Sequence, residues 1–200
     1  PPLPQMLFAL IAQIAYAPWF LKLLIVLADL AVIAGIVAIL QQRGQAIAWA
    51  AFYAFNPLSL VAYAGEAHFD AFFLATAVWA VWAYDRSKKR TALLLISLAS
   101  GIKWITLPLI PFFCRPNLLK HGLLALIFTL LPAVYFWDSL AQLAQGLFEF
   151  GHQMQFNAPF RSALNQLGLS SWEASAATLG LFASVIGWRW LRHADNSLDS

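Results

Sequence analysis

The sequence predicts an all-α fold, namely a polytopic transmembrane helix bundle with broken or re-entrant helices and an outer loop that carries interfacial helices. Hydrophobic residues make up 62% of the chain and charged residues only 10%, whereas a soluble domain has about 25% charged residues. Such a chain has more apolar surface than one soluble core can bury. The apolar residues also gather in stretches of about 20, the length of a helix that crosses a bilayer.

Five apolar stretches are expected to span the membrane. They are residues 19–41, 45–64, 69–85, 119–137 and 172–192. The second stretch should be kinked or broken at Asn56 and Pro57, because proline removes a backbone hydrogen bond in a helix interior. Residues 3–17, which Pro18 ends, are expected to form an amphipathic helix along the membrane interface.

The stretch 91–113 has two interpretations. As one helix it would put the basic runs at 86–90 and 115–121 on opposite faces of the membrane. As a re-entrant pair that turns near residues 101–103, it puts both runs on one face. Because basic loops are enriched on the cytoplasmic side, we prefer the re-entrant pair, which requires protein or a water-filled cavity around it.

This choice orients the rest of the chain. Arg43, Arg189 and Arg192 also fall on the cytoplasmic side, as the basic runs do. The segment 65–70 and the long loop 138–171 then face the non-cytoplasmic side.

We expect one transmembrane domain over residues 1–192 and a polar tail at 193–200, since no repeat or flexible linker divides the chain. The chain starts with PPLPQ, without Met or a charged signal segment, so we expect a fragment that lacks its N-terminal part. The net charge of +3 is modest, and no nucleic-acid partner is expected. Cys114 is the single cysteine, so it can form no internal disulfide, and no metal site is predicted.

The sequence GEAHFD at residues 65–70 places two carboxylates and an imidazole at the end of a span. Glu66, His68 and Asp70 could bind a cation, a phosphate-linked head group or a sugar, since carboxylates accept from sugar hydroxyls and histidine can donate to phosphate. A solvated turn between two spans explains the same residues, and the spacing alone favours this plainer interpretation.

Lys103 lies between two apolar stretches. A lysine deep in a membrane costs about 2.5–3.5 kcal/mol on insertion scales, so it normally faces a cavity or a partner. We favour a fixed positive charge for a phosphate; the alternatives are a lysine that snorkels or one that pairs with a carboxylate such as Asp29. For Asp29, in the middle of a span, we expect a structural partner, and Lys22 is expected to snorkel.

The loop 138–171 contains short amphipathic pieces and, after an aromatic stretch, Asn157 and Arg161. These two could form a polar pocket in which Arg161 binds a phosphate. An ordinary interfacial loop accounts for the composition equally well.

Several motifs in order resemble the GT-C superfamily of polytopic membrane glycosyltransferases, in particular its mannosyltransferase-like bacterial members. The resemblance covers roughly residues 1–170. It rests on AFNPLSLVAYAGEAHFDAFFL, SLASGIKWITLPLIPFF and FGHQMQFNAPFRSALNQLG. The matching positions are Asn56, Pro57, Leu58, Gly65, His68, Asp70, Lys103, Pro108, Pro111, Phe156 and Asn157.

The resemblance implies transfer of a mannose-like hexose from a polyprenyl-phosphate carrier to a glycan or lipid acceptor. The reaction would occur on the non-cytoplasmic face of a bacterial inner or plasma membrane, with the bilayer itself as a partner. It implies His68, Asp70, Lys103 and Asn157 as substrate-binding residues, and the loop composition adds Arg161 to this set.

The resemblance places the catalytic base before Pro1, with Glu66 as a weaker candidate inside the chain. No cofactor is implied with certainty, and a divalent cation stays open. The alternatives are a multi-pass transporter or flippase, because broken helices and a buried lysine also occur there, and a non-catalytic membrane fragment.

Overall fold

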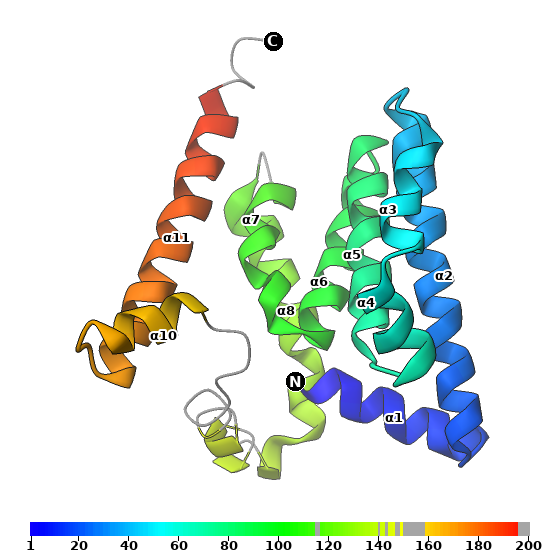
Figure 1. Ribbon diagram of the computed structural model, residues 1–200, viewed down its shortest axis with the longest axis horizontal. Coiled ribbons are helices and arrows are strands. Elements are labelled where there is room, and N and C mark those ends of the chain that lie inside the picture. The colour runs from blue at the N-terminus through cyan, green and yellow to red at the C-terminus, as the bar shows by residue number, and fades with distance from the viewer. Residues whose placement is uncertain (115–116, 140, 143, 147–148, 150–158, 196–200) are drawn as a thin grey trace. The chain divides into compact units, whose positions relative to one another are not determined.

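The computed structural model describes residues 1–114, 117–139, 141–142, 144–146, 149 and 159–195, with only the backbone at 139 and 193–195. Every regular element within these residues is a helix, which confirms the predicted all-α class. The chain forms two compact units, Pro1–Phe136 and Trp137–Ser200. Each unit is described by itself (Figure 1).

The first unit begins with two helices separated by a short extended segment. Helix α1 (Pro2–Ile14) runs across the end of the bundle, whereas α2 (Pro18–Gln42) runs along it (Figure 1). Pro18 occupies the first turn of α2, where its missing N–H has no intrahelical partner to lose. The 25 residues of α2 are long and apolar enough to span a membrane, which makes α2 a candidate for the span predicted at 19–41.

The predicted break at Asn56 and Pro57 is confirmed. A 3₁₀ turn (Ile47–Ala50) and α3 (Ala51–Ala54) precede it, and α4 (Pro57–Ser59) and a π-helical segment (Leu60–Gly65) follow it. The two halves are bent by 51°. The Asn56 side chain accepts a hydrogen bond of 3.0 Å from the Leu58 N–H, so it caps the new helix that proline forces to begin.

The chain then forms a helical hairpin, α5 (Asp70–Asp85) and α6 (Lys89–Ile102). A third piece returns along α6 as a 3₁₀ helix (Trp104–Leu109) and α7 (Ile110–Phe113). The predicted turn near residues 101–103 is confirmed, because α6 ends at Ile102 and Lys103 is extended. The rings of Tyr84 and Phe113 lie 5.3 Å apart, so the returning piece reaches the end of the unit where α5 stops. Whether a membrane holds this pair as re-entrant stays a prediction.

Helix α8 (Leu118–Tyr135) completes the first unit, and basic residues gather at one end of that unit. Arg43 Nη2 lies 2.6 Å from Asp85 Oδ2, and one pocket contains side chains from the starts of both α6 and α8. We call this the basic end. Its residues are Arg43, Arg86, Lys88, Lys89, Arg90, Lys120 and His121.

The interior of the first unit is built from small side chains, and its surface is apolar. Fully buried Ala80, Ala83 and Ala92 let α5 and α6 pack closely. Helix α8 instead exposes large residues such as Ile127 (57%) and Leu131 (57%). Apolar surface of this extent fits contact with lipid.

Among the described residues, α2 and α8 are long and apolar enough to span a membrane, and the bent pair at Asn56 would make a third span. The stretches predicted at 69–85 and 172–192 are helical as α5 and α11 (Ser171–Asp195). However, α5 has only 16 residues, and neither helix meets the spanning criterion of length and hydropathy. Their role as spans stays a prediction.

The second unit contains a 3₁₀ turn (Trp137–Ser139), α10 (Pro159–Gln166) and α11. Helix α11 begins with a capping box, in which Glu173 Oε2 accepts from the Ser170 N–H at 2.8 Å and the Glu173 N–H donates to Ser170 Oγ at 3.3 Å. The predicted division into a domain over 1–192 and a tail at 193–200 stays a prediction, and residues 196–200 lie outside the described residues.

Candidate functional site

The GEAHFD segment forms a tight turn at the end of the first unit opposite the basic end. The Glu66 N–H donates to the Val61 carbonyl at 2.8 Å and the His68 N–H to the Ala62 carbonyl at 2.7 Å. Between them Ala67 has a φ of +57°, a left-handed conformation that is uncommon for a residue with a Cβ. These bonds fix the course of the chain into α5.

Asp70 brings three of the predicted residues together. Its carboxylate lies in the first turn of α5, where the helix dipole favours negative charge. Lys103 Nζ donates to Asp70 Oδ2 at 2.5 Å, and His68 Nδ1 lies 3.5 Å from the same oxygen. We call Asp70, Lys103 and His68 the Asp70 cluster.

Lys103 occupies a break in the helix that buried hydroxyl groups stabilise. Its carbonyl accepts from the N–H and the hydroxyl of Thr106 at 3.3 and 3.1 Å. The Thr106 hydroxyl also lies 2.9 Å from that of Ser100, and both residues are buried. The Lys103 side chain remains 41% exposed, so its ammonium group can donate to a ligand as well as to Asp70.

The second oxygen of Asp70 is available to a ligand. Oδ1 is buried and has no hydrogen-bond partner among the described residues. A buried carboxylate oxygen without a donor is costly, and a bound hydroxyl group would supply one. The Asp70 cluster therefore offers a cation for an anionic group and an acceptor for a hydroxyl group.

Glu66 does not join this cluster. It is exposed, and the described residues include no side-chain partner for it. Lys22 was missed as a residue of the site: instead of only snorkelling, its Nζ donates to the Gly65 carbonyl at 2.9 Å and anchors the GEAHFD turn to α2. In the sequence, only the position of Lys22 near the start of the span 19–41 indicated that it could lie at this end of the unit.

The alternative in which Lys103 pairs with a carboxylate is confirmed, but the partner is Asp70 and not Asp29. Asp29 is buried, 8% exposed, and its Oδ1 accepts from the Tyr53 hydroxyl at 2.8 Å. The structural partner that we expected for Asp29 is therefore a tyrosine of the broken helix. Lys103 reaches Asp70 instead, because the chain turns at Lys103 and begins α5 at Asp70 on the same end of the unit.

The two remaining predicted residues belong to another part of the chain. Asn157 lies outside the described residues, as does Phe156. Arg161 lies in α10 of the second unit. Their contribution to the site stays a prediction.

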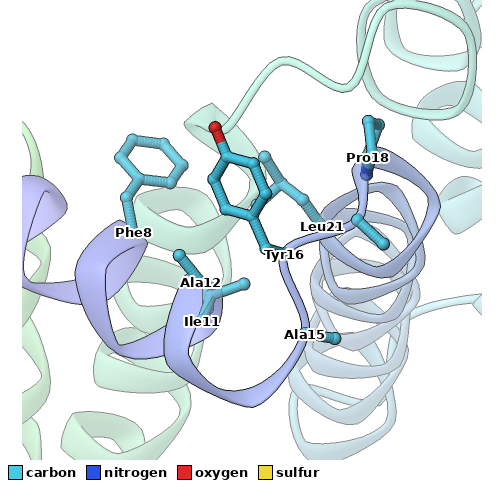
Figure 2. A pocket seen from close by; sticks show the side chains of 8 residues that line it. Phe8, Ile11, Ala12, Ala15, Tyr16, Pro18 and Leu21 are labelled. Carbon is cyan, nitrogen blue, oxygen red and sulfur yellow. The ribbon is translucent and has the colours of Figure 1, made fainter.

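The first unit also contains an apolar pocket. It has a volume of about 370 Å³ and lies where α1 meets α2 (Figure 2). Figure 2 shows the ring of Tyr16 between Phe8 and Leu21. The ring of Phe8, which lines the pocket, lies 5.6 Å from the ring of Phe69 in an edge-to-face contact. One wall residue of the pocket thus contacts the residue that precedes Asp70.

A metal centre is not evident in the described part of the chain. No group of three or more His, Cys, Asp or Glu side chains there could hold an ion. The divalent cation that the resemblance left open stays untested.

The fold and the site together define a helical membrane protein with an ion-paired polar cluster and an apolar pocket. A family comparison then identifies its class: residues 3–115 match the family model described as the N-terminal domain of alpha-(1->6)-mannopyranosyltransferase. The match covers more than half of the chain, and the chain belongs to this family. No curated protein and no solved structure matches it significantly.

Family membership confirms the mannosyltransferase resemblance and places the chain among mannosyl-transferring glycosyltransferases, which act on a sugar donor and an acceptor. It favours the transferase over the transporter. Glu66, His68, Asp70 and Lys103 all lie inside the matched residues, whereas Asn157 and Arg161 lie beyond them.

Proposed function

We propose that this protein is a GT-C-type enzyme that transfers a mannosyl group from a polyprenyl-phosphate carrier to an acceptor hydroxyl on the non-cytoplasmic face of the membrane. The observation that carries the proposal is the Asp70–Lys103 pair. These two opposite charges, far apart in an apolar sequence, meet in the structure, and a pocket with apolar walls lies in the same unit.

The chemistry needs a cation where Lys103 lies. The acceptor oxygen attacks C1 of the sugar, the bond from C1 to the phosphate oxygen breaks, and the phosphate leaves with the electron pair. Negative charge grows on that oxygen, and a fixed ammonium group beside it lowers the barrier. Asp70 holds the ammonium group by one hydrogen bond and leaves its other protons for the phosphate.

The acceptor proton must go to a base. Asp70 is a poor candidate, because its Oδ2 already accepts a hydrogen bond from Lys103 Nζ. Its free Oδ1 suits a hydroxyl group of the bound sugar instead. An acidic residue before Pro1 and the exposed Glu66 remain the two proposed sources of the base.

The lipid carrier would use the apolar pocket. Its walls come from the end of α1 and the start of α2, including Ile11 and Leu21. The contact of Phe8 with Phe69 joins one wall of this pocket to the turn that carries Asp70. A polyprenyl chain in this pocket would keep its phosphate within reach of Lys103.

The proposed sidedness follows from the basic end. Because lysine and arginine are enriched in cytoplasmic loops, the end with Arg90 and Lys120 would face the cytoplasm. The Asp70 cluster lies at the other end of the first unit and would face outward.

The test is transfer of radiolabelled mannose from a polyprenyl-phosphate donor in membranes that contain the product of the complete gene. Lys103→Ala and Asp70→Ala should each lower the rate by about 100-fold, the usual loss when one charge-stabilising donor is removed. Lys88→Ala, which removes the same charge at the basic end, is the matched control and should leave the rate unchanged. Full activity in both site variants would refute the assignment of the site.

A further inference from the structure

A second pocket lies at the basic end, away from the Asp70 cluster. It has a volume of about 410 Å³ and takes its lining from α6 and α8 of the first unit. The lining residues are Lys89, Arg90, Leu93, Leu94, Lys120, His121, Leu124 and Phe128. The proposed transfer reaction uses none of them.

The cations of this pocket lack acidic partners. Among the residues that the structure describes, no carboxylate lies within ion-pair distance of Lys89, Arg90 or Lys120. Other cations of the basic end are engaged: Arg43 pairs with Asp85, and Arg86 lies 4.9 Å from the centre of the Trp82 ring. The pocket therefore concentrates positive charge that an anion could neutralise.

Two helix starts add to this charge. Helix α6 begins at Lys89 and α8 at Leu118. The free N–H groups and the dipole at a helix start favour an anion. Because both starts lie at the same pocket, their effect adds to that of the side chains.

Apolar side chains continue from the cations along the helices. On α8, Leu124 and Phe128 follow Lys120 by four and eight residues and thus share its face; on α6, Leu94 follows Arg90 by four. Leu124, Phe128 and Leu94 are 38%, 41% and 43% exposed. A phosphate site followed by an exposed apolar strip matches a phospholipid better than a free phosphate.

We propose that this pocket binds an anionic phospholipid. The phosphate is held by Arg90 and Lys120, and an acyl chain packs on Leu124 and Phe128. Basic pockets between membrane helices bind such head groups because attraction to the charged leaflet adds to the contacts with the chain. The bound lipid joins the starts of α6 and α8. None of the residues that would bind it takes part in the proposed reaction.

The test compares two variants with equal loss of charge in nanodiscs of phosphatidylcholine with increasing phosphatidylglycerol. Arg90→Gln/Lys120→Gln removes two cations from the pocket, and Arg86→Gln/Lys88→Gln removes two from the same end outside it. Retained lipid is counted by native mass spectrometry. The pocket variant should lose affinity by about fivefold for each cation removed, and the control variant by much less. Equal losses in the two variants would mean a diffuse surface charge and would overturn the proposal.

A second arm separates a lipid from a soluble phosphate. Phe128→Ala keeps every charge, and it should weaken phosphatidylglycerol binding. Millimolar inorganic phosphate should not displace the lipid. Efficient displacement by phosphate, together with unchanged lipid binding by Phe128→Ala, would overturn the lipid assignment. Thermal melting of each variant in pure phosphatidylcholine verifies that it is folded. If the double variant Arg90→Gln/Lys120→Gln does not fold, the single variant Lys120→Gln, at an exposed position, replaces it.

Discussion

The Asp70–Lys103 pair joins the first residue of α5 to the residue that follows α6, and the two side chains are 18% and 41% exposed. If the pair stabilises the turn at Lys103, Asp70→Asn and Lys103→Gln should not act independently. We expect the double variant to be more stable than the sum of the single effects predicts, by about 0.5–3 kcal/mol. Unfolding in detergent of the wild type, both single variants and the double variant measures this coupling.

A control for this cycle pairs Asp70→Asn with Lys88→Gln. Lys88 lies at the basic end, where its Nζ is 5.4 Å from the centre of the Trp82 ring. Distant changes add, so this second cycle should show no coupling. Equal coupling in both cycles would mean that net charge, and not the pair, determines the result.

The hydrogen bond from Tyr53 to Asp29 gives a second prediction at this scale. Tyr53→Phe removes the only donor that the structure shows for buried Asp29 among the described residues. Leaving a buried carboxylate without that donor should lower the free energy of unfolding by about 1–3 kcal/mol. Thermal melting in detergent detects the loss. Tyr135→Phe is the control, because Tyr135 is 77% exposed and its change should be silent.

The sequence could identify the charged residues of the site but not their partners. Asp70 and Lys103 stand out because charge is rare in apolar stretches. Their pairing depends on how α5 and α6 pack side by side, and composition does not encode that packing. The hydroxyl groups of Ser100 and Thr106, which stabilise the turn, gave no signal, because serine and threonine are common in membrane helices.

At the scale of elements, close packing of α2 on α5 depends on Gly35. A Cβ atom at this position would lie 2.7 Å from Val78 Cγ1 and 3.3 Å from Trp79 Nε1. Trp79 cannot move freely, since its indole N–H donates to the Ala31 carbonyl at 3.0 Å. Gly35→Ala should therefore lower the free energy of unfolding by about 1–3 kcal/mol, as overpacking does.

Gly122 provides the opposite case. A Cβ atom there meets no other atom within 4 Å. Gly122→Ala should stabilise α8 by up to about 1 kcal/mol, because alanine favours a helix. Melting of both variants in the same detergent gives the comparison, and a stabilising Gly35→Ala would show that α2 and α5 do not pack as described.

The boundaries of these helices were predictable where the sequence changes its chemistry. Pro57 predicted a break, because a proline ring excludes a helix hydrogen bond wherever it occurs. The change from apolar to charged residues at Asp85 predicted the end of the stretch 69–85, and α5 (Asp70–Asp85) matches that stretch to within one residue. The left-handed conformation of Ser87, with a φ of +57°, was not predictable, because a non-glycine residue gives no warning of it.

At the scale of the whole molecule, the first unit has two chemically different ends. The Asp70 cluster lies at one, and the basic residues with their pocket lie at the other. The bend at Asn56 and the turn at Lys103 both contribute to this arrangement. Each allows a short helix to begin or end at one of the two ends of the unit. If a membrane contains the unit, the two ends face different compartments.

Labelling of single cysteines in intact cells tests this arrangement. In a Cys114→Ser background, Glu66→Cys should react with an impermeant maleimide from outside, and Asn117→Cys should react only after the cells are opened. Both positions are exposed. Native Cys114 is buried, which raises the pKa of its thiol, and it should react more slowly than the cysteine at 117.

The other labelling outcomes would each contradict a different part of the proposed topology. Reaction of position 117 from outside and of 66 only in opened cells would invert the orientation, and the proposed reaction would then face the cytoplasm. Reaction of both positions from outside would mean that residues 91–113 cross the membrane fully, against the return of α7 to the basic end. Residues Ile96, Phe113 and Ala125 of α6, α7 and α8 belong to one buried cluster, which fits the return of α7 along α6. We therefore expect position 66 to react from outside and position 117 to react only in opened cells.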